Sequence, residues 1–581
     1  MRFELMLGDE AAARGAIDAG IGGAFSYPGT PATEIFEYVE EYLRNSPQYA
    51  GGGTGADSLG ISALWSANEK VAYEEALGMS YAGRRALVSM KHVGVNVAAD
   101  PLMSSAITGV NAGLVLVVGD DPGMHSSQNE QDTRYYHDFA QIPLFEPANQ
   151  QEAYDQVIEA FEYSEAVGLP VIVRMVTRLC HSRSNVRLRE PVGMAERGEP
   201  TVLAGKRLPN RPEPNDWVLM PSNARRRYRR LLDLQPRLLR DSEESPWNSI
   251  RLSGRRGIIT CGLARNYVDE VLGDSDDDSR LHIGRYPIPL ALLRRFVDHC
   301  NEILVVEDGY PFIERKLNGL LGLPGKAIKG RLTGDFALDG ELTPDSVAAA
   351  LGVPFVSAAL PLGDLAARPP QLCKGCPHAD SFKAIVEAAA PLGDAYMFSD
   401  IGCYALGVLP PFRAVHSCVD MGASIAMAHG AAQAGAHPVI STIGDSTFAH
   451  SGMTPLIGAA HANANMTVFI LDNATVGMTG TQESMACGER LDHLIQGLGV
   501  HPDHLHVIEP LAKHHSANVS LIRREIEYRG LSVIVARRAC IHVKRQSTAP
   551  GGAPQRERAA EGSCGASCSC TPLTVHAEHS D

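Results

Sequence analysis

The residues most suited to chemistry lie in two acidic segments, and each segment ends an apolar run. Gly444-Asp445-Ser446 closes the β-branched run VISTIGD, and Asp472-Asn473 closes the run TVFILDN. From Gly444 to Asn473, counted inclusively, is 30 residues. Mg²⁺ takes oxygen ligands and is often shared with phosphate, and glycine lets the backbone approach a phosphate group closely. A carboxylate and an amide in this setting therefore predict a magnesium–diphosphate site.

The elements that must position these residues form a strand–helix–strand unit. Residues 451–463 have a helical pattern between the two apolar runs. The strands of such a unit are parallel, so both carboxyl ends lie at one sheet edge, where open α/β sheets bind ligands. A bare Gly-Asp-Ser is otherwise typical of a turn and helix cap, so its place at a strand end is what favours a ligand site.

Size and charge limit the class of protein. A chain of 581 residues exceeds one hydrophobic core, so three or four domains are expected. The net charge of −15 argues against nucleic acid or an anionic membrane as the main partner. We find no apolar run of membrane-spanning length and no secretory signal, so we expect a cytoplasmic protein. The 12 cysteines are then metal ligands or free thiols rather than disulfides.

Five segments are expected along the chain. Alternating strand and helix patterns predict a doubly wound parallel-sheet domain over 1–185 and a smaller α/β unit over 257–360. Residues 361–545 hold the diphosphate-site motifs. Between these units, 186–256 are rich in Arg and Pro and favour a helix-bearing connector with a solvated basic face over a nucleic-acid patch. Residues 546–581 have a disordered composition.

Eight sequence blocks in order resemble the large (alpha) subunit of the indolepyruvate:ferredoxin oxidoreductases. This group belongs to the thiamine-diphosphate-dependent 2-oxoacid:ferredoxin oxidoreductases. The blocks are YPGTPATEI (27–35), SANEKVAYEEALGMSYAG (66–83), MKHVGVNVAADP (90–101), SSQNEQDTRYY (126–136), CKGCPH (373–378), SDIGCYALG (399–407), MGASIAMAHG (421–430) and DNATVGMTGTQ (472–482).

The resemblance implies a multi-domain α/β fold that binds thiamine diphosphate. Two doubly wound domains would bind the pyrimidine and the diphosphate, and 257–360 would form a transketolase-C-terminal-like domain. Asp445, Asn473 and the carbonyl of Thr475 would ligate Mg²⁺. The remaining cofactor-binding residues that it implies are Gly444, Ser446, Gly422, Ser424, Met478 and Thr479.

The resemblance also implies catalytic residues in the N-terminal domain. Glu69 matches the carboxyl group that engages the pyrimidine ring nitrogen when the thiazolium C2 proton leaves; taken alone, it reads as a first-turn glutamate that complements the helix dipole. Thr30 matches the threonine that binds the 2-oxo acid carboxylate, with turn chemistry as its other reading. Lys91 and His92 either add positive charge near that carboxylate or are ordinary loop residues.

Four cysteines match the ligands of an iron–sulfur cluster in relatives whose core carries one. Cys373-x-x-Cys376, Cys403 and Cys540 would supply the four thiolates of a single [4Fe-4S] cluster, and buried thiols are the alternative. Lys374 stands where a proline is usual. The remaining cysteines up to residue 545 read as ordinary core or loop thiols: Cys180, Cys261, Cys300, Cys418 and Cys487.

One departure affects the electron acceptor. The large subunit usually ends in a ferredoxin-like module with two C-x2-C-x2-C-x3-C runs, whereas this sequence ends with Cys564, Cys568 and Cys570 at another spacing. We therefore expect the two outer clusters to be absent, which leaves ferredoxin, another protein or a flavin as the acceptor.

The implied reaction converts an aryl 2-oxo acid, such as indolepyruvate or phenylpyruvate, and coenzyme A into the aryl-acetyl-CoA and CO₂. A small (beta) subunit would complete a heterotetramer. Two other functions stay open: a non-oxidative thiamine-dependent decarboxylase or carboligase without a cluster, and a catalytically silent scaffold.

Overall fold

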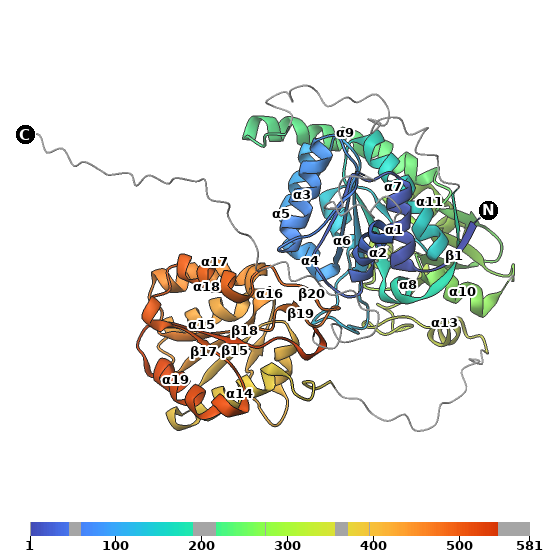
Figure 1. Cartoon of the computed structure of the whole chain (residues 1–581). Coiled ribbons are helices and arrows are strands. Elements are labelled where there is room, and N and C mark those ends of the chain that lie inside the picture. Colours follow the sequence, from blue (N-terminus) through green and yellow to red (C-terminus); the bar gives the residue numbers. More distant parts are fainter. Residues whose placement is uncertain are drawn as a thin grey trace, which may run out of the picture.

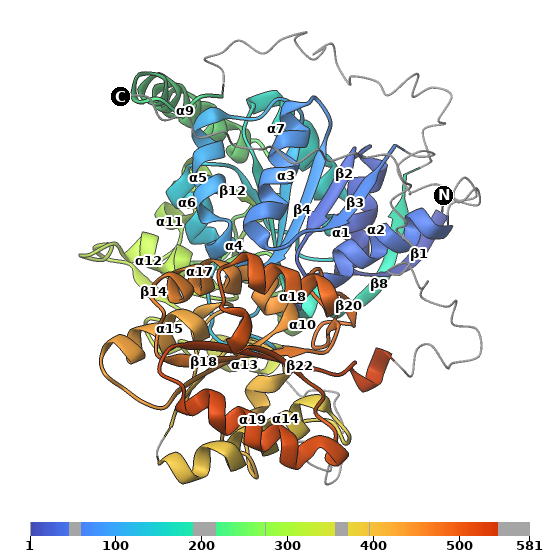
Figure 2. The same cartoon turned by 60° about the vertical axis from the view of Figure 1, so that its left-hand side comes forward.

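The structure, a computed structural model, describes residues 2–45, 60–189, 217–273, 275–354, 370–393 and 395–543. Two large sheet domains lie against each other, and a smaller third domain adjoins the first (Figures 1 and 2). The expected tail over 546–581 lies outside the described residues. No helix in the described part of the chain is both long and apolar enough to cross a membrane.

The N-terminal domain is built on a seven-stranded sheet that is parallel except for one edge strand. Its order is β12 (Arg285–Tyr286), β6 (Leu144–Phe145), β7 (Val171–Val176), β5 (Leu114–Asp120), β4 (Ala86–Lys91), β2 (Gly23–Ser26) and β3 (Ser62–Trp65). Only β12 runs antiparallel to its neighbour. Beside this sheet, β1 (Arg2–Leu7) pairs with β8 (Arg183–Leu188).

Helices cover both faces of this sheet because its central strands are apolar on both sides. In β5, Val115 and Val117 belong to one buried cluster, and Leu114, Leu116 and Val118 belong to the other. Successive side chains of a strand point to opposite faces, so one apolar run supplies two cores. One core includes α1 (Gly8–Asp18), α2 (Thr33–Asn45), α7 (Gln150–Val167) and α8 (Thr177–His181); the other includes α3 (Glu69–Tyr81), α4 (His92–Val97) and α5 (Ala99–Thr108).

The third domain carries a five-stranded sheet of order β14 (Ala327–Lys329), β13 (Glu302–Val306), β10 (Arg256–Cys261), β11 (Ser279–Ile283) and β9 (Ser249–Arg251). β9 falls within the expected connector, and β12 of the N-terminal sheet falls within the range expected for the third domain. Its helices are α10 (Ala264–Leu272), α11 (Leu290–His299), α12 (Phe312–Asn318) and α13 (Pro344–Leu351).

A network of buried charges joins the first and third domains. Arg134, in α6 (Arg134–Ala140), donates to Glu307 at 2.7 Å and to Asp132 at 3.0 Å. Arg174 donates to Asp120 at 2.6 Å and to the carbonyl of Asp308 at 3.0 Å. Buried ions are stable only when they are paired and hydrogen-bonded, so this network fixes how the two domains meet.

The C-terminal domain is built on a six-stranded, wholly parallel sheet. Its order is β16 (Ser417–Cys418), β15 (Tyr396–Ser399), β17 (Val439–Gly444), β18 (Met466–Asp472), β22 (Leu531–Arg537) and β21 (Leu505–Ile508). Its helices are α14 (Pro377–Ala389) and α19 (His515–Glu527) on one face, with α15 (Ala423–Gln433), α17 (Met453–His461) and α18 (Gly488–Gly497) on the other.

The predicted strand–helix–strand unit is confirmed. β17 and β18 pair in parallel, and the chain between them forms the short α16 (Asp445–Thr447), the π-helical turn η5 (Phe448–Gly452) and α17. The predicted helix over 451–463 therefore begins earlier and contains a wide turn at its start.

Candidate active site

The ends of β17 and β18 bring the predicted magnesium ligands to one edge. Gly444 pairs with Leu471, so Asp445 and Asn473 follow at neighbouring strand ends. Both are buried, and Oδ2 of Asp445 has no hydrogen-bond partner among the described residues. Burial, followed by the nearby charge of Asp472, raises the pKa of Asp445 to about 7. A buried acceptor that lacks a donor fits a cation, since a divalent charge would favour the ionised carboxylate.

Thr475 follows in a turn that Asn473 stabilises. The Thr475 amide donates to Oδ1 of Asn473 at 3.1 Å, and the Asn473 side-chain nitrogen lies 3.3 Å from Nε2 of His378. Burial, followed by the charge of Arg538, lowers the pKa of His378 to about 4, so the ring is neutral beside the amide.

Gly422 and Ser424 lie at the start of α15, where Asp400 holds their backbone amides. Asp400 is not among the site residues predicted from the sequence. Oδ1 of Asp400 accepts the amide of Gly422, and Oδ2 accepts the amide of Ser424 at 3.0 Å. Gly422 has φ +96°, and a Cβ there would lie 2.5 Å from Cβ of Ser451. Only glycine fits this approach. Asp400 follows β15 directly, so its place at a strand end in SDIGCY could have marked it as a site residue.

Met478 and Thr479 lie in the hairpin between β19 (Thr475–Val476) and β20 (Gln482–Glu483). Met478 is exposed, and Thr479 donates to the side-chain oxygen of Gln482 at 2.6 Å. Gln482 also donates to Glu37 of α2 at 2.8 Å, so this hairpin touches the N-terminal domain.

A narrow cleft lies where the two large domains meet. Tyr27, which follows β2, contacts Ser446 through their hydroxyl groups at 3.0 Å. The lining residues from the N-terminal domain are Tyr27, Pro28, Trp65, Ser66 and Ala67; those from the C-terminal domain are Ser446, Ala449, Val476, Glu483 and Met485. The predicted diphosphate residue Ser446 therefore lies beside the other domain.

Glu69 is the first residue of α3 and faces this junction. Asn68 caps the helix by accepting the amide of Val71 at 2.9 Å, which fixes where α3 begins. The Glu69 side chain is buried, and its Oε2 lies 2.7 Å from Nε2 of His450 in the C-terminal domain. Glu69 does lie in the first turn of α3, but its side chain is buried against the opposite domain rather than solvated.

Thr30 lies in the loop after β2, and Lys91 is the last residue of β4 at the same sheet edge. Ser126 donates to the carbonyl of Thr30 at 3.1 Å, and Lys91 donates to the carbonyl of Ser126 at 2.9 Å. Burial lowers the pKa of Lys91 to about 8, against the opposing charges of Asp121 and Glu69. Among the described residues, no carboxylate pairs directly with the Lys91 amine. This amine, which lies near Thr30, is therefore suited to bind an anion.

His92 is buried at the first position of α4. Its Nε2 lies 3.1 Å from the carbonyl of Asn129, and its Nδ1 has no partner among the described residues. The structure therefore ties His92 to the 126–130 loop rather than to Glu69.

The four predicted cluster cysteines come from three separate segments and gather at one place. The Cys376 amide donates to the carbonyl of Cys373 at 3.0 Å in a turn before α14, and Cys403 begins the 3₁₀ turn η4 (Cys403–Val408). Burial, followed by the charges of Cys376, Cys540 and Cys373, raises the pKa of Cys403 to about 11. The thiols are thus close enough to oppose one another's ionisation. The iron ions of a cluster would stabilise them as thiolates.

These four cysteines (the thiol group) adjoin the loop of Asn473, the predicted magnesium ligand. The Cys540 amide donates to the carbonyl of Asn473 at 3.0 Å. A Cβ placed on Gly477 would lie 3.5 Å from Sγ of Cys403 and 3.8 Å from Nδ2 of Asn473. An iron–sulfur cluster held by these cysteines would therefore lie beside the predicted diphosphate site.

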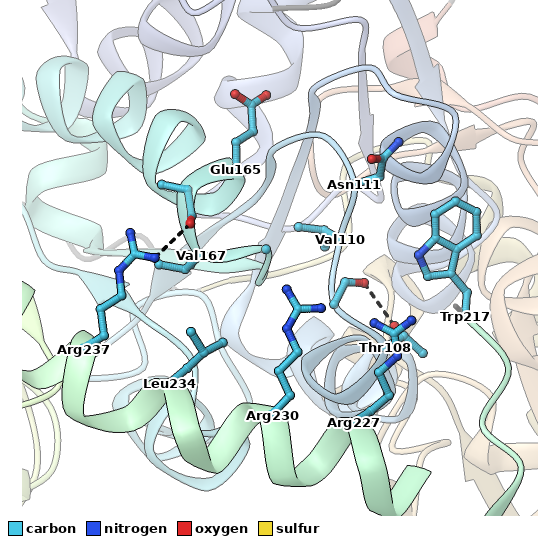
Figure 3. Close-up of a pocket in the computed structure, with 13 residues that line it drawn as sticks. Thr108, Val110, Asn111, Glu165, Val167, Trp217, Arg227, Arg230, Leu234 and Arg237 are labelled. Atoms are coloured by element: carbon cyan, nitrogen blue, oxygen red, sulfur yellow. Dashed lines mark hydrogen bonds between the residues drawn. The ribbon is translucent and has the colours of Figure 1, made fainter. Parts of the chain in front are cut away.

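A larger cleft, of about 300 Å³, lies away from this site (Figure 3). Arg227, Arg230 and Arg237 of α9 (Pro221–Glu243) point toward residues 108–111 and 165–168, which are the last residues of α5 and α7 and the start of the loops that follow. These loops precede β5 and β7, so the cleft lies at the amino ends of the strands, opposite the edge where α/β sheets bind ligands. The predicted connector helix is confirmed, and most of its arginines are exposed.

Comparison with known proteins agrees with this geometry. The model described as "Pyruvate flavodoxin/ferredoxin oxidoreductase, thiamine diP-bdg" matches residues 14–228, and "Thiamine pyrophosphate enzyme, C-terminal TPP binding domain" matches 400–524. The chain is 38% identical over 562 residues to the indolepyruvate oxidoreductase subunit IorA of Archaeoglobus fulgidus, covering 92% of this chain and 86% of the relative. It is 35% identical over 579 residues to the IorA subunit of Pyrococcus abyssi, covering 92% of this chain and 85% of the relative.

The chain belongs to the IorA family. It is thus a thiamine-diphosphate-dependent oxidoreductase acting on 2-oxo acids. For this IorA-family chain, the predicted family, fold class and enzyme class are confirmed. The separate roles of the site residues stay predictions.

Proposed function

We propose that this chain is the catalytic large subunit of an enzyme that oxidatively decarboxylates aryl 2-oxo acids. The substrate and coenzyme A would give an aryl-acetyl-CoA and CO₂, and two electrons would leave through an iron–sulfur cluster to ferredoxin or another acceptor. One observation carries the proposal: at the domain junction Glu69 contacts His450, which follows Asp445 in the other domain, while Asn473 follows the neighbouring strand beside four gathered cysteines.

The residues at this junction fit Mg²⁺ and thiamine diphosphate. Asp445 and Asn473 would hold the cation, together with the Thr475 carbonyl, while the amides around Gly422 and Ser424 and the hydroxyl of Ser446 would face the diphosphate. Met478 and Thr479 would cover the cofactor from the 475–483 hairpin. When bound, the cofactor supplies the electron sink for decarboxylation.

Glu69 would act on the pyrimidine end of the cofactor. Its side chain is buried at the domain junction, where a carboxyl group can hydrogen-bond a ring nitrogen and hold a shared proton. The carboxyl is fixed by the start of α3, so its position does not depend on a mobile loop.

Thr30 and Lys91 would bind the substrate carboxylate. The Thr30 hydroxyl would supply a hydrogen bond and the Lys91 ammonium would supply charge, and both residues lie at the carboxyl edge of the N-terminal sheet. His92 supports the neighbouring loop in this proposal.

Cys373, Cys376, Cys403 and Cys540 would ligate one [4Fe-4S] cluster. This ligand set favours oxidative over non-oxidative chemistry, because a simple decarboxylase has no need for an electron exit beside its cofactor. The IorA relatives are named as subunits of an oxidoreductase, which supports a small partner subunit and a heterotetramer.

The test is anaerobic reconstitution of the chain with its partner subunit. We expect the complex to release CO₂ from an arylpyruvate only when coenzyme A is present, and to reduce a ferredoxin or a dye as it does so. The reconstituted chain should contain about four iron and four sulfide. Aldehyde production without iron, sulfide or acceptor reduction would instead establish the non-oxidative reaction.

A further inference from the structure

His450 lies opposite Glu69 across the domain junction. It belongs to η5, the π-helical turn after β17, and its Nε2 lies 2.7 Å from Oε2 of Glu69. The two side chains are 1% and 8% exposed. The π-turn is a wide turn of a kind often found at functional sites, and here it carries a buried imidazole to the other domain's carboxylate.

Both ring nitrogens of His450 have partners. Nδ1 lies 2.7 Å from the hydroxyl of Ser451, and Nε2 contacts Glu69. A neutral imidazole has one donor and one acceptor nitrogen, and the hydrogen bond at one nitrogen sets the role of the other. The Ser451 hydroxyl can donate to Nδ1, which leaves Nε2–H to donate to the carboxylate.

The imidazole is also held in place from the N-terminal domain. The side chain of Asn68 donates to the carbonyl of His450 at 2.9 Å. The ring of Tyr27 packs edge-on against it, with 4.7 Å between the ring centroids. The helix cap of α3 and the first turn after β2 thus fix the same residue that contacts Glu69.

The two carboxylate oxygens of Glu69 have different surroundings. Oε2 is engaged by His450, whereas Oε1 lies against Gly94, where a Cβ would come within 2.8 Å of it. The carboxylate therefore has little freedom to rotate. Oε2 is tied to the imidazole, and within the described part of the chain no hydrogen bond engages Oε1.

We propose that His450 is the positioning residue for Glu69. Through the Ser451–His450–Glu69 chain it orients the carboxylate so that Oε1 meets the pyrimidine ring nitrogen, and it makes this alignment depend on contact between the two domains. The inference rests on the proposed function, because it assigns the orientation of Glu69 toward thiamine diphosphate.

The test uses two variants of the full chain in its complex, His450→Phe and His450→Gln. The readouts are the affinity for Mg²⁺–thiamine diphosphate by calorimetry and the rate of hydrogen–deuterium exchange at C2 of the bound cofactor by acid quench and NMR. Phenylalanine fills the space without a donor, and the glutamine amide can restore the donor. The matched control, Glu37→Ala, removes the Gln482 contact between the same two domains without touching Glu69.

For His450→Phe we expect retained cofactor affinity and C2 exchange slowed roughly 10- to 100-fold, the range for losing an outer partner that orients a ligand. His450→Gln should recover most of the rate, and Glu37→Ala should keep it. Unchanged exchange in His450→Phe would overturn the inference, and so would equal slowing in the Phe and Gln variants or in Glu37→Ala. Failure of the proposed function would look different: the unsubstituted complex would release aldehyde without reducing an acceptor, whatever the C2 exchange rates of the variants.

Discussion

At the scale of single residues, the site depends on a few buried polar groups whose partners lie far away in sequence. Glu69 contacts His450, and Tyr27 contacts Ser446. Asp445 keeps an unpartnered oxygen within the described part of the chain. Buried polar atoms rarely lack partners, so such an atom marks a place for a ligand rather than for packing.

Replacing Glu69 with Gln should lower substrate-dependent CO₂ release by roughly 10²- to 10⁴-fold, the usual contribution of a positioned acid–base group. Cofactor affinity should change little, because the proposed diphosphate and cation contacts lie in the other domain. Steady-state kinetics and calorimetry check both parts. Glu74→Gln, on the exposed side of the same helix, should behave like the unsubstituted chain; full activity in Glu69→Gln would contradict the assignment.

Lys91 gives a pH prediction. Its pKa is lowered to about 8, so the amine is charged below pH 8 and becomes neutral above it. Attraction for the substrate carboxylate is therefore present at low pH and lost as the pH rises through 8. We expect KM for the 2-oxo acid to rise between pH 7 and 9, and Lys91→Met to show a high KM without that pH dependence. A variant that keeps the same dependence would show that another group is responsible.

At the scale of elements, the strand ends were predictable and the contacts between domains were not. The runs VISTIGD and TVFILDN fix β17 and β18 through their apolar, β-branched residues, so the place of Asp445 and Asn473 followed from local pattern. His450 gave no such signal, because its partner is set by how two sheets meet. The Arg134 network was missed for the same reason, whereas Asp400 has its partners, Gly422 and Ser424, within its own domain.

The buried network between the first and third domains predicts a large stability effect. Arg134→Met should leave Glu307 as a buried charge without its cation, remove one of the two arginines that pair with Asp132, and lower the free energy of unfolding by about 3–5 kcal/mol. Arg251→Met removes a solvent-exposed pair with Asp276 and should cost at most about 1 kcal/mol. Denaturant unfolding of the unliganded chain measures both; equal, small effects would show that the network does not hold the domains together.

At the scale of the whole molecule, the site exists only because two sheet domains meet with their carboxyl edges facing. The predicted cation ligands and the four cysteines belong to the C-terminal domain, and Glu69, Thr30 and Lys91 belong to the N-terminal domain. Figure 2 shows these two domains against each other. The Asn473 carbonyl that accepts the Cys540 amide also connects the cation loop to the thiol group.

The thiol group predicts the metal content of the molecule. Cys376→Ala or Cys403→Ala should abolish most cluster iron and acid-labile sulfide after anaerobic reconstitution, because a four-iron cluster needs its thiolate ligands. Cys300→Ala, in the five-stranded domain, should retain both. Iron analysis and the visible absorption spectrum check this, and unchanged iron in the Cys376 and Cys403 variants would exclude the assigned ligands.

The most direct test of the whole account is calorimetric titration of the complex with thiamine diphosphate at saturating Mg²⁺. We predict saturable heat with one cofactor per large subunit, dependent on the metal and lost in Asp445→Ala. Absence of binding heat, or binding that Asp445→Ala leaves unchanged, would contradict the placement of the cofactor between these two domains.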